Sequence, residues 1–472
     1  MPAGCGPVKA ALTGRTVIAW AVIVTAAVPV LGQGSAPERA GTEEARRGDD
    51  PMPLVLPLRD RAAVVDRWLE RRLDTVVPEI MRREGIDLWI VAAREYDEDP
   101  VIETMLPATW MAARRRTVLI LVDHGPGQPV ERLAVARYDV GSFPRAWEPE
   151  RQPDQWGRVA EIIAQRDPRV IAVDRSATFA LADGLSGSEY DALLAALPPS
   201  YRDRVVSAER LAIGWLETRI PEEMEVYPHI VRIAHRIISE GLSSAAIQPG
   251  VTSTEDVVWW YRERILELGL DTWFQPSVSV QRRATGPVAT GDFSSRPDDS
   301  VIRPGDLLHV DFGITYLRLN TDTQQHAYVL RPGETDAPAG LRRALAVGNR
   351  LQDLLTGSFA TGRNGNEILA RALRQAASEG IAATIYTHPI GFHGHAAGPT
   401  IGLWDQQGGV PGTGDYPLFP NTAHSIELSA AVEVPEWGGQ TVMIMLEEDA
   451  IFDGDRTRYI DGRQTDLWLI PR

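Results

Sequence analysis

The N-terminal half of the chain alternates between two periodicities of hydrophobic residues. Apolar residues recur at helical spacing from Arg59 to Arg83, and short apolar runs that are typical of strands follow. Strands are predicted at Asp87–Ala92, Thr117–Val122, Leu133–Tyr138 and Val170–Val173, and further helices near 155–165 and 188–197. Strands that alternate with helices predict an α/β domain with a mainly parallel or mixed sheet.

The second half begins with a predicted helix whose first residues are typical of a helix N-terminus. Pro221 is favoured in a first helical turn because it has no N–H to satisfy, and Glu222 and Glu223 interact well with the helix dipole. The apolar pattern then predicts helices at Asp256–Gly269 and near 339–356 and 365–379, strands at Phe274–Val280, Ser425–Ser429 and Met443–Ile451, and a hairpin within 306–330. We therefore expect a domain boundary near Thr218–Pro221.

The first 52 residues differ from the rest of the chain. Lys9 and Arg15 precede an apolar stretch from Thr16 to Leu31, and small residues follow it, as in a secretory signal. The predicted organisation is a signal peptide at 1–33, a flexible linker at 34–52, an N-terminal α/β domain at 53–215 and a catalytic domain at 216–472. An uncleaved membrane anchor is the alternative, although the segment is short and contains Pro29. We expect an exported protein, periplasmic or secreted, with no stable membrane insertion after signal removal.

Composition and charge narrow the classes of function. The chain is 44% hydrophobic and 24% charged, which is typical of soluble globular proteins. A net charge of −16 argues against nucleic acid or an anionic membrane surface as a partner. No G-x-G-x-x-G follows a predicted strand, so nucleotide binding has no support. The single cysteine, Cys5, lies within the predicted signal, so the mature chain would have neither a disulfide nor a cysteine nucleophile.

Two aspartates around the predicted hairpin are the first candidates for chemistry. The run Leu307–Val310 predicts a buried strand, and Gly313 permits a turn or bulge after it. A chain reversal near Tyr316-Leu317 would place Asp311 and Asp322 directly opposite each other, at a Cβ separation of roughly 4.5–5.5 Å. A divalent metal ion would supply the positive charge that such a pair requires. Solvated turn residues are the alternative for the aspartates taken alone.

Further candidate ligands follow residue 380. His388, His393 and His395 lie among small residues that allow a close backbone approach, and imidazole is a common metal ligand. Glu427 and Glu447 lie in apolar runs, where a buried carboxylate is costly without compensation. Each has an ordinary alternative, either a satisfied core histidine or a carboxylate in water at a strand end. Together with the aspartates they predict a site for one or two divalent ions.

The order of these residues resembles the M24 pita-bread metallopeptidases, which include aminopeptidase P, prolidase and methionine aminopeptidase, with creatinase as a non-metal relative. The resemblance covers about 217–460, and the preceding domain is similar to the N-terminal domain of the aminopeptidase P and creatinase branch. It implies an α+β fold class, with a C-terminal pita-bread fold after an α/β creatinase-type domain. It also implies a metal-dependent hydrolase, an aminopeptidase P-like exopeptidase that cleaves an N-terminal amide bond of a peptide or small amide substrate, and the predicted signal would make it an exported one. Dimeric relatives leave a homodimer open.

The same resemblance implies a role for each candidate. Asp311 would be a terminal ligand of one metal ion, Asp322 and Glu447 would bridge two ions, and His395 and Glu427 would be ligands of the second. The hydroxide that attacks the amide would lie between the ions, and Glu427 would take the proton from the water and return it to the leaving amine. Four carboxylates and one imidazole suit Mn²⁺, with Co²⁺, Zn²⁺ or Fe²⁺ as alternatives.

The chain departs from the family around the ligands. The peptidases have a histidine that contacts substrate before the first aspartate, and this chain has none between His235 and His309. They have another after the metal-binding histidine, and none occurs here between His395 and His424. His393 is our candidate to replace the missing catalytic histidine, with His388 as the alternative. His393 is also an alternative to His395 as the ligand.

Two further departures keep other functions open. Thr323-Gln324-Gln325 follows the second aspartate, where the family usually has Thr-Arg-Thr, and Met445 stands where an arginine is common. The first alternative is a non-catalytic or altered-specificity pita-bread protein that binds a peptide or small amide ligand. The second is a hydrolase of another class built on the histidine cluster alone, although no H-E-x-x-H helix pattern supports it.

Overall fold

The computed structural model describes residues 51–284 and 300–471. The predicted signal peptide (1–33) lies outside the described residues, as does all but the end of the predicted linker (34–52). Among the residues described, none of the helices is both long and apolar enough to cross a membrane.

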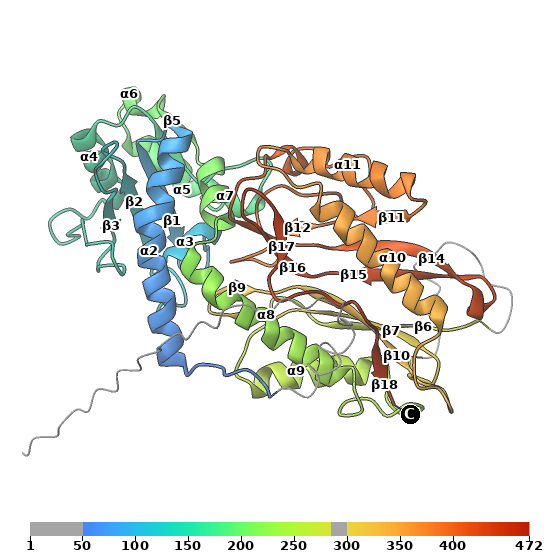
Figure 1. The fold of residues 1–472 in the computed structure, drawn as a ribbon. Helices are drawn as coiled ribbons and strands as arrows, with labels where there is room; N and C mark the ends of the chain where they lie inside the picture. Colours follow the sequence, from blue (N-terminus) through green and yellow to red (C-terminus); the bar gives the residue numbers. More distant parts are fainter. Residues whose placement is uncertain (1–50, 285–299, 472) are drawn as a thin grey trace, which may run out of the picture.

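The N-terminal domain is a mixed five-stranded sheet with helices on both faces (Figure 1). Strand β1 pairs antiparallel with β2 and parallel with β4, which confirms the predicted mixed sheet. In spatial order the strands are β3 (Glu131–Val135), β2 (Arg116–Val122), β1 (Leu88–Arg94), β4 (Ile171–Val173) and β5 (Val205–Ser207). The helices are α2 (Leu58–Glu84), α3 (Pro100–Met105), α4 (Gln155–Arg166), α5 (Gly187–Ala196), α6 (Pro199–Arg202) and α7 (Glu209–Glu217).

The central strand β1 is apolar up to its last residue, Arg94, because both of its faces are buried. Leu88 and Ile90 pack in the cluster that contains α4, and Trp89 and Val91 pack in the cluster that contains α2. A strand covered by helices on both sides has no solvated face, so its sequence reads as a continuous apolar run. The sequence therefore showed the strand without showing which residue faces which helix.

Two buried carboxyl groups meet where α3 begins. Asp99 caps this helix, because its Oδ1 accepts hydrogen bonds from the N–H groups of Val101 (2.7 Å) and Ile102 (2.9 Å). Asp174 follows β4 and accepts a hydrogen bond from Trp89 Nε1 at 2.7 Å. Burial raises the pKa of Asp99 to about 7, and burial together with the charge of Asp99 raises the pKa of Asp174 well above its usual range. The pair is most stable when one carboxyl group keeps its proton and donates it to the other.

The C-terminal domain places three curved sheets between two pairs of helices (Figure 1). Helices α8 (Pro221–Gly241) and α9 (Thr254–Glu267) lie on one side, and α10 (Ala339–Thr356) and α11 (Gly365–Ser378) lie on the other. In spatial order, the first sheet contains β18 (Trp468–Ile470), β10 (Thr323–Val329), β7 (Leu307–Phe312) and β6 (Ser277–Gln281). The second contains β11 (Ala382–Ile385), β14 (Leu428–Val434) and β15 (Gln440–Leu446). The third contains β12 (His388–Pro389), β13 (Thr422–Ser425), β16 (Asp449–Phe452) and β17 (Thr457–Tyr459). This arrangement confirms the predicted fold class.

The predicted register of the central hairpin is wrong. The chain reverses at Leu317 and Arg318, between β8 (Thr315–Tyr316) and β9 (Leu319–Asn320), and both turn residues have positive φ (55° and 63°). This two-residue turn is one position later than the predicted reversal, so Asp311 pairs with Gln324 and not with Asp322. Such a turn normally contains Gly or Asn, and neither occurs here, so the sequence did not reveal it.

Two arginines connect the N-terminal and C-terminal domains. Arg72 of α2 is completely buried, forms an ion pair with Glu223 of α8 at 3.1 Å, and donates a hydrogen bond to the carbonyl of Thr218 at 2.6 Å. Arg318, at the tip of the hairpin, donates to the carbonyl of Leu106 at 2.8 Å, just after α3. The hairpin that follows Asp311 is thus held against the N-terminal domain.

Candidate metal centre

The two aspartates lie near adjacent ends of β7 and β10. Val310 and Phe312 of β7 point into the hydrophobic core, so Asp311 between them points to the other face of the sheet. Asp322 immediately precedes β10, and its backbone N–H lies 3.3 Å from a carboxylate oxygen of Asp449. The diagonal arrangement still brings the two carboxylates together.

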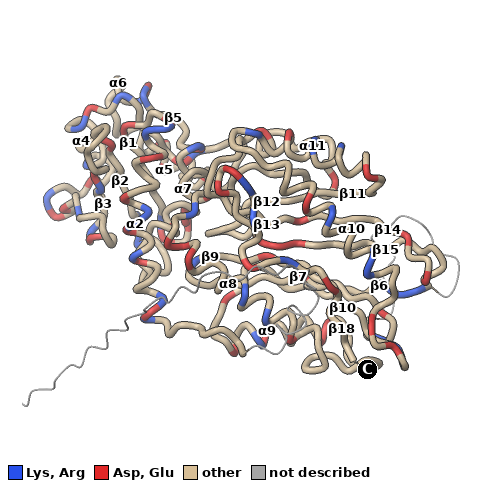
Figure 2. Tube along the Cα trace, viewed as in Figure 1, with Lys and Arg blue, Asp and Glu red and all other residues tan. Residues whose placement is uncertain are grey.

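The two glutamates lie at breaks between strands. The sequence pattern predicted one continuous strand around each, but β13 ends before Glu427 and β14 begins after it, and β15 ends before Glu447. Strands β13 and β16 belong to one sheet, whereas β14 and β15 belong to another, so the chain passes from sheet to sheet at both glutamates. Figure 2 shows acidic positions on these strands inside the domain, away from its helical surfaces.

Six side chains converge at this point and form three overlapping groups. In each group the ligand atoms of all three members lie within 4.8 Å of one another. The groups are Asp311, Asp322 and Glu447; His388, Glu427 and Glu447; and Asp322, His388 and His395. Glu447 belongs to the first two groups, which is the position expected of a carboxylate shared by two ions.

The electrostatics of the cluster favour a cation. Burial raises the pKa of Asp311 to about 8, and burial together with the charges of Glu447 and Asp311 raises the pKa of Asp322 well above its usual range. Burial and the charge of Glu447 likewise raise the pKa of Glu427. Asp311 Oδ1 and Asp322 Oδ1 are buried with no hydrogen-bond partner among the described residues. A donor set of unpaired carboxylate oxygens and an imidazole fits a divalent metal ion.

His388 lies in the middle of the carboxylates. Its Nε2 is 3.3 Å from Glu447 Oε1 and 3.6 Å from Asp322 Oδ2, and its Nδ1 lies 2.9 Å from the Pro389 carbonyl. Burial lowers the pKa of His388, but the adjacent Glu447 carboxylate outweighs this effect and raises the pKa to about 9. A backbone carbonyl on Nδ1 fixes the ring so that Nε2 faces the acidic cluster.

Gln324 supports both glutamates. Its Nε2 donates hydrogen bonds to Glu427 Oε1 at 2.5 Å and to Glu447 Oε2 at 2.8 Å. His309 Nε2 lies 2.9 Å from Gln324 Oε1, and since an amide oxygen can only accept, the histidine must donate. This contact fixes the orientation of the amide, so His309 and Gln324 together position the two carboxylates.

Comparison with known proteins identifies this arrangement. The sequence profile described as metallopeptidase family M24 matches residues 229–451, a range that contains all six converging side chains. The C-terminal domain belongs to metallopeptidase family M24. A search of curated proteins found no match.

Solved structures that resemble the chain extend over both domains. X-Pro aminopeptidase from Thermotoga maritima is 15% identical, with 83% of this chain and 99% of that chain covered and a TM-score of 0.59. Xaa-Pro dipeptidase from Bacillus anthracis is 16% identical (88% and 100% covered, TM-score 0.53), and aminopeptidase P from Escherichia coli is 13% identical (85% and 96% covered, TM-score 0.54). At this identity the likeness shows the fold, an M24 domain preceded by a second domain.

The other two candidate histidines, His393 and His395, lie in different places. His395 is exposed at the rim of the cluster and contacts the rings of His388 and Trp273, with centroids 4.6 Å and 5.0 Å apart. His393 belongs to none of the three groups, and its ring is instead largely buried against the backbone of Pro100 in the N-terminal domain. The cluster therefore contains the predicted ligand His395 but not the predicted catalytic residue His393.

Sequence reasoning missed two contributors to the M24 centre. It named His388 among the candidate histidines but assigned the ligand role to His395, with His393 as the alternative, and it noted Gln324 only as a departure from the family. Spacing alone could not show that the ring of His388 faces inward, because β12 is only two residues long. For Gln324 a signal was present, since its neighbours Thr323 and Gln325 are also buried polar residues that need partners.

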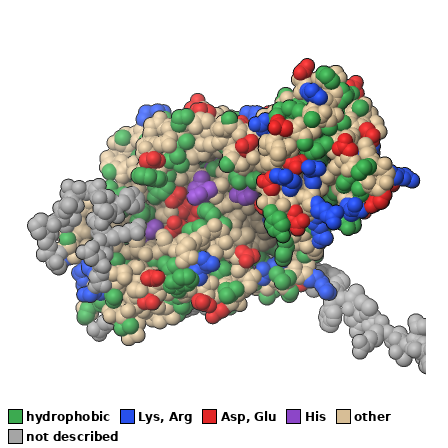
Figure 3. Space-filling view, turned by 180° about the vertical axis from the view of Figure 1, so that it is seen from behind, with side chains coloured by type: hydrophobic (Ala, Val, Ile, Leu, Met, Phe, Trp, Pro, Cys, Tyr) green, Lys and Arg blue, Asp and Glu red, His purple; other side chains and the backbone are tan. Residues whose placement is uncertain are grey.

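A cavity of about 790 Å³ leads to the M24 centre between the two domains. Its walls include Trp110 and Met111 of the N-terminal domain and Trp273, Phe392 and His395 of the C-terminal domain. Figure 3 shows acidic and histidine side chains gathered in a hollow of the larger lobe, and a group of basic side chains on the smaller lobe beside it. Substrates would thus meet residues of both domains.

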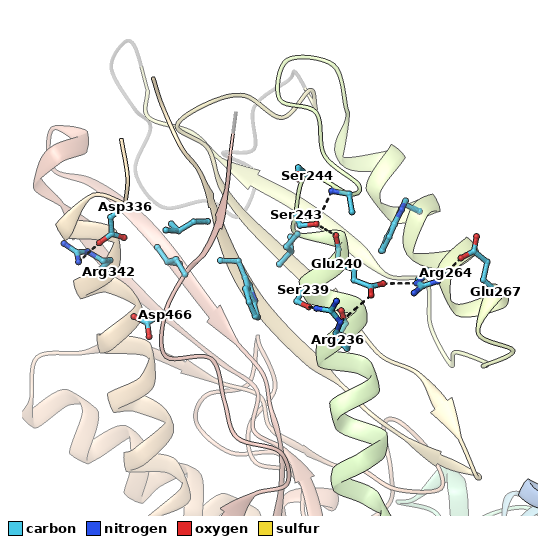
Figure 4. A pocket seen from close by; sticks show the side chains of 16 residues that line it. Arg236, Ser239, Glu240, Ser243, Ser244, Arg264, Glu267, Asp336, Arg342 and Asp466 are labelled. Atoms are coloured by element: carbon cyan, nitrogen blue, oxygen red, sulfur yellow. Dashed lines mark hydrogen bonds and ion pairs between the residues drawn. The ribbon is translucent and has the colours of Figure 1, made fainter. Parts of the chain in front are cut away.

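Another cavity, of about 870 Å³, lies at the far side of the M24 domain between α8, α9 and β18 (Figure 4). Most of the charged side chains along it are paired, as in Arg264 with Glu240 at 2.9 Å and Arg342 with Asp336 at 2.7 Å. None of the six converging side chains lines it. Its size therefore does not make it the candidate active site.

Proposed function

We propose that this protein is an exported, aminopeptidase P-like exopeptidase that hydrolyses an N-terminal amide bond with two divalent metal ions. The observation that carries the proposal is the convergence of four carboxylates and His388 in groups that share Glu447. The M24 match and the names of the similar structures, which are aminopeptidases and dipeptidases, support hydrolysis of peptides.

The residues divide into two sets of ligands. Asp311, Asp322 and Glu447 would hold one ion, and His388, Glu427 and Glu447 would hold the other. Their hard, oxygen-rich character suits Mn²⁺, with Co²⁺, Zn²⁺ or Fe²⁺ as alternatives. Bound ions of this kind lower the pKa of a water molecule and polarise a substrate carbonyl.

The protein's own side chains would then move the proton and guide the substrate. Glu427 Oε1 is occupied by the Gln324 amide, which leaves Oε2 to accept the proton of the attacking water and to return it to the leaving amine. His395, at the rim, faces the cavity through which a substrate arrives. The aromatic side chains of the cavity would exclude water from the amide bond.

Metal analysis combined with a peptidase assay tests the proposal. We expect purified protein to contain about two ions per chain, to release the first residue of X-Pro peptides or other peptides, and to lose both metal and activity in Asp311→Asn or Glu447→Gln. The matched control is Glu433→Gln, an exposed carboxylate on β14 that should change neither property. Wild-type protein that binds no divalent metal would overturn the proposal.

The choice of histidine has its own test. His388→Ala should remove the second ion, whereas His395→Ala should retain both ions and impair turnover. The reverse result would restore His395 as the ligand.

One alternative function has a specific observation in its favour. His393 belongs to none of the ligand groups and lies in the wall of the approach cavity, so only His395 is both at the cluster and in the path of a substrate. A protein that retains its metal yet hydrolyses neither dipeptides nor X-Pro peptides would be a binding protein for a peptide or small amide ligand.

Export is the remaining part of the proposal. It rests on the positive residues Lys9 and Arg15 and on the apolar stretch that runs to Leu31. Cell fractionation with N-terminal sequencing of the mature protein tests it, and a cytoplasmic chain that retains Met1 would contradict it.

A further inference from the structure

A run of three arginines lines a second cavity beside the candidate active site. The cavity measures about 680 Å³ and lies in the N-terminal domain, where Arg114, Arg115 and Arg116 precede or begin β2 and Arg137 lies across from them. Trp110, Tyr138 and Trp147 add aromatic walls. Four cationic groups around one cavity are unusual in a chain whose net charge is −16.

The segment that carries the arginines has a fixed backbone. Arg115 adopts a positive φ of 56°, a conformation that is rare for residues other than Gly, Asn and Asp. Its carbonyl accepts a hydrogen bond from the Glu95 N–H at 2.7 Å, and the Arg114 N–H donates to Thr117 Oγ1 at 3.2 Å. A strained conformation that is held on both sides is typical of a functional segment.

Two of these cations lack an acidic partner. Arg116 forms an ion pair with Glu189 at 2.6 Å, and Arg137 forms one with Glu150 at 2.6 Å. Arg114 and Arg115 are exposed and form no ion pair with the described residues. Arg114 instead lies over the ring of Trp110, 4.8 Å from its centroid. The Glu95 carboxylate also lines the cavity, and its Oε2 accepts a hydrogen bond from the backbone N–H of Arg115 at 3.4 Å, but it forms no ion pair with the guanidinium group of either arginine.

This arginine cavity adjoins the cavity that leads to the metal centre. Trp110 and Met111 line both, and Met111 is fully exposed between them. An exopeptidase holds only the first residues of its substrate at the reacting bond, so the rest of a peptide must leave along the surface. The surface next to the metal centre leads past Met111 to Arg114 and Arg115.

We propose that the arginine cavity binds carboxylate groups in the C-terminal part of an acidic peptide substrate, a few residues beyond the bond that is cleaved. This inference rests on the proposed exopeptidase function. Guanidinium groups bind carboxylates through paired hydrogen bonds, and the aromatic walls would pack against the peptide between its charges.

The binding test uses purified full-length protein and peptides that an exopeptidase cannot cleave. The probes are N-acetylated Ala-Pro-Gly-Gly-Glu-Glu and the matching peptide with Gln in place of both Glu, each with a fluorescent label. We expect the acidic peptide to bind about tenfold more tightly at low salt, as two to three surface charge contacts would give, and this preference to fade as salt screens the charges.

The double variant Arg114→Gln/Arg115→Asn should abolish the preference, and Asn is chosen because it tolerates the left-handed backbone at 115. The matched control is Arg371→Gln/Arg374→Gln, which removes two exposed arginines from α11 and should leave the preference unchanged. Equal binding of both peptides, or a preference that survives in Arg114→Gln/Arg115→Asn, would overturn the proposal.

Hydrolysis of the same two peptides without the N-acetyl group distinguishes this proposal from the proposed function. If the protein is a peptidase, Arg114→Gln/Arg115→Asn should raise KM for the acidic peptide about tenfold without a matching fall in kcat. If it hydrolyses both peptides with equal KM, the exopeptidase function stands and the arginine cavity does not select acidic substrates. If it hydrolyses neither, the proposed function fails while the binding preference still tests the cavity.

Discussion

The buried pair Asp99 and Asp174 makes a clear prediction about stability and pH. Asp99→Asn keeps a side-chain oxygen to cap α3 and provides an N–H₂ group that can donate to Asp174, so the fold should tolerate it. The variant loses the proton that titrates in the wild-type pair. We therefore expect the wild type and Asp99→Asn to differ in how their stability depends on pH.

The size of the effect follows from the pKa of Asp99. Because its folded-state pKa of about 7 lies above the unfolded value, protonated Asp99 stabilises the fold fully below about pH 4, and this contribution is lost as the pH rises through 7. A difference of roughly three pKa units corresponds to about 4 kcal/mol, at about 1.4 kcal/mol for each unit. The wild type should therefore lose up to about 4 kcal/mol relative to Asp99→Asn between pH 4 and pH 8.

Urea unfolding at pH 4, 5, 6, 7 and 8, followed by tryptophan fluorescence, measures this difference. The control is Asp97→Asn, because Asp97 is exposed in the same segment and Arg94 lowers its pKa, so its charge does not change over this range. If the stabilities of the wild type and Asp99→Asn change in parallel from pH 5 to pH 8, the shared proton does not exist.

Three further predictions concern the metal centre and the junction between the domains. Gln324→Leu should weaken divalent-metal affinity about 10–100-fold, measured by competition with a chelator, because the two glutamates lose the group that orients them; unchanged affinity would contradict that role. Removing metal with EDTA should lower the thermal midpoint, and Mn²⁺ should restore it, because the ions bind only the folded state; an unchanged midpoint would argue against a site of useful affinity. Arg72→Met should destabilise the protein by about 3 kcal/mol in urea unfolding, because the buried Glu223 then keeps only the more distant Arg219, at 3.5 Å. The control is the exposed ion pair of Arg71 with Glu222, where Arg71→Met should lower the free energy of unfolding by less than about 1 kcal/mol. Equal losses of stability in the two variants would contradict a larger contribution from the buried Arg72.

The sequence correctly predicted those helices and strands whose hydrophobic pattern depends on their own local packing and not on distant contacts. Helix α10 occupies the predicted range 339–356 because one of its faces packs on β14 and the other meets water. Strand β6 begins at Ser277, three residues later than predicted, because Pro276 has no N–H for a strand ladder. In both cases the local sequence determines the element, and the prediction is wrong only at the start of β6.

The hairpin and the histidines depended on distant contacts. Arg318 adopts a left-handed conformation while its side chain reaches the carbonyl of Leu106 in the other domain, a contact about two hundred positions away in the chain. Likewise, only the packing of the sheets decides that His388 faces the acidic cluster and that His393 faces Pro100. The nature of the candidate centre could be predicted from residue types, but its individual members required the fold.

The ligands of the candidate centre come from separate stretches between positions 311 and 447 of the chain. A growing polypeptide therefore cannot complete the site until residue 447 has been synthesised. Any truncated product that stops before residue 447 would lack the carboxylate common to both ions. Cation uptake would consequently report that every stretch from 311 to 447 has been made and folded.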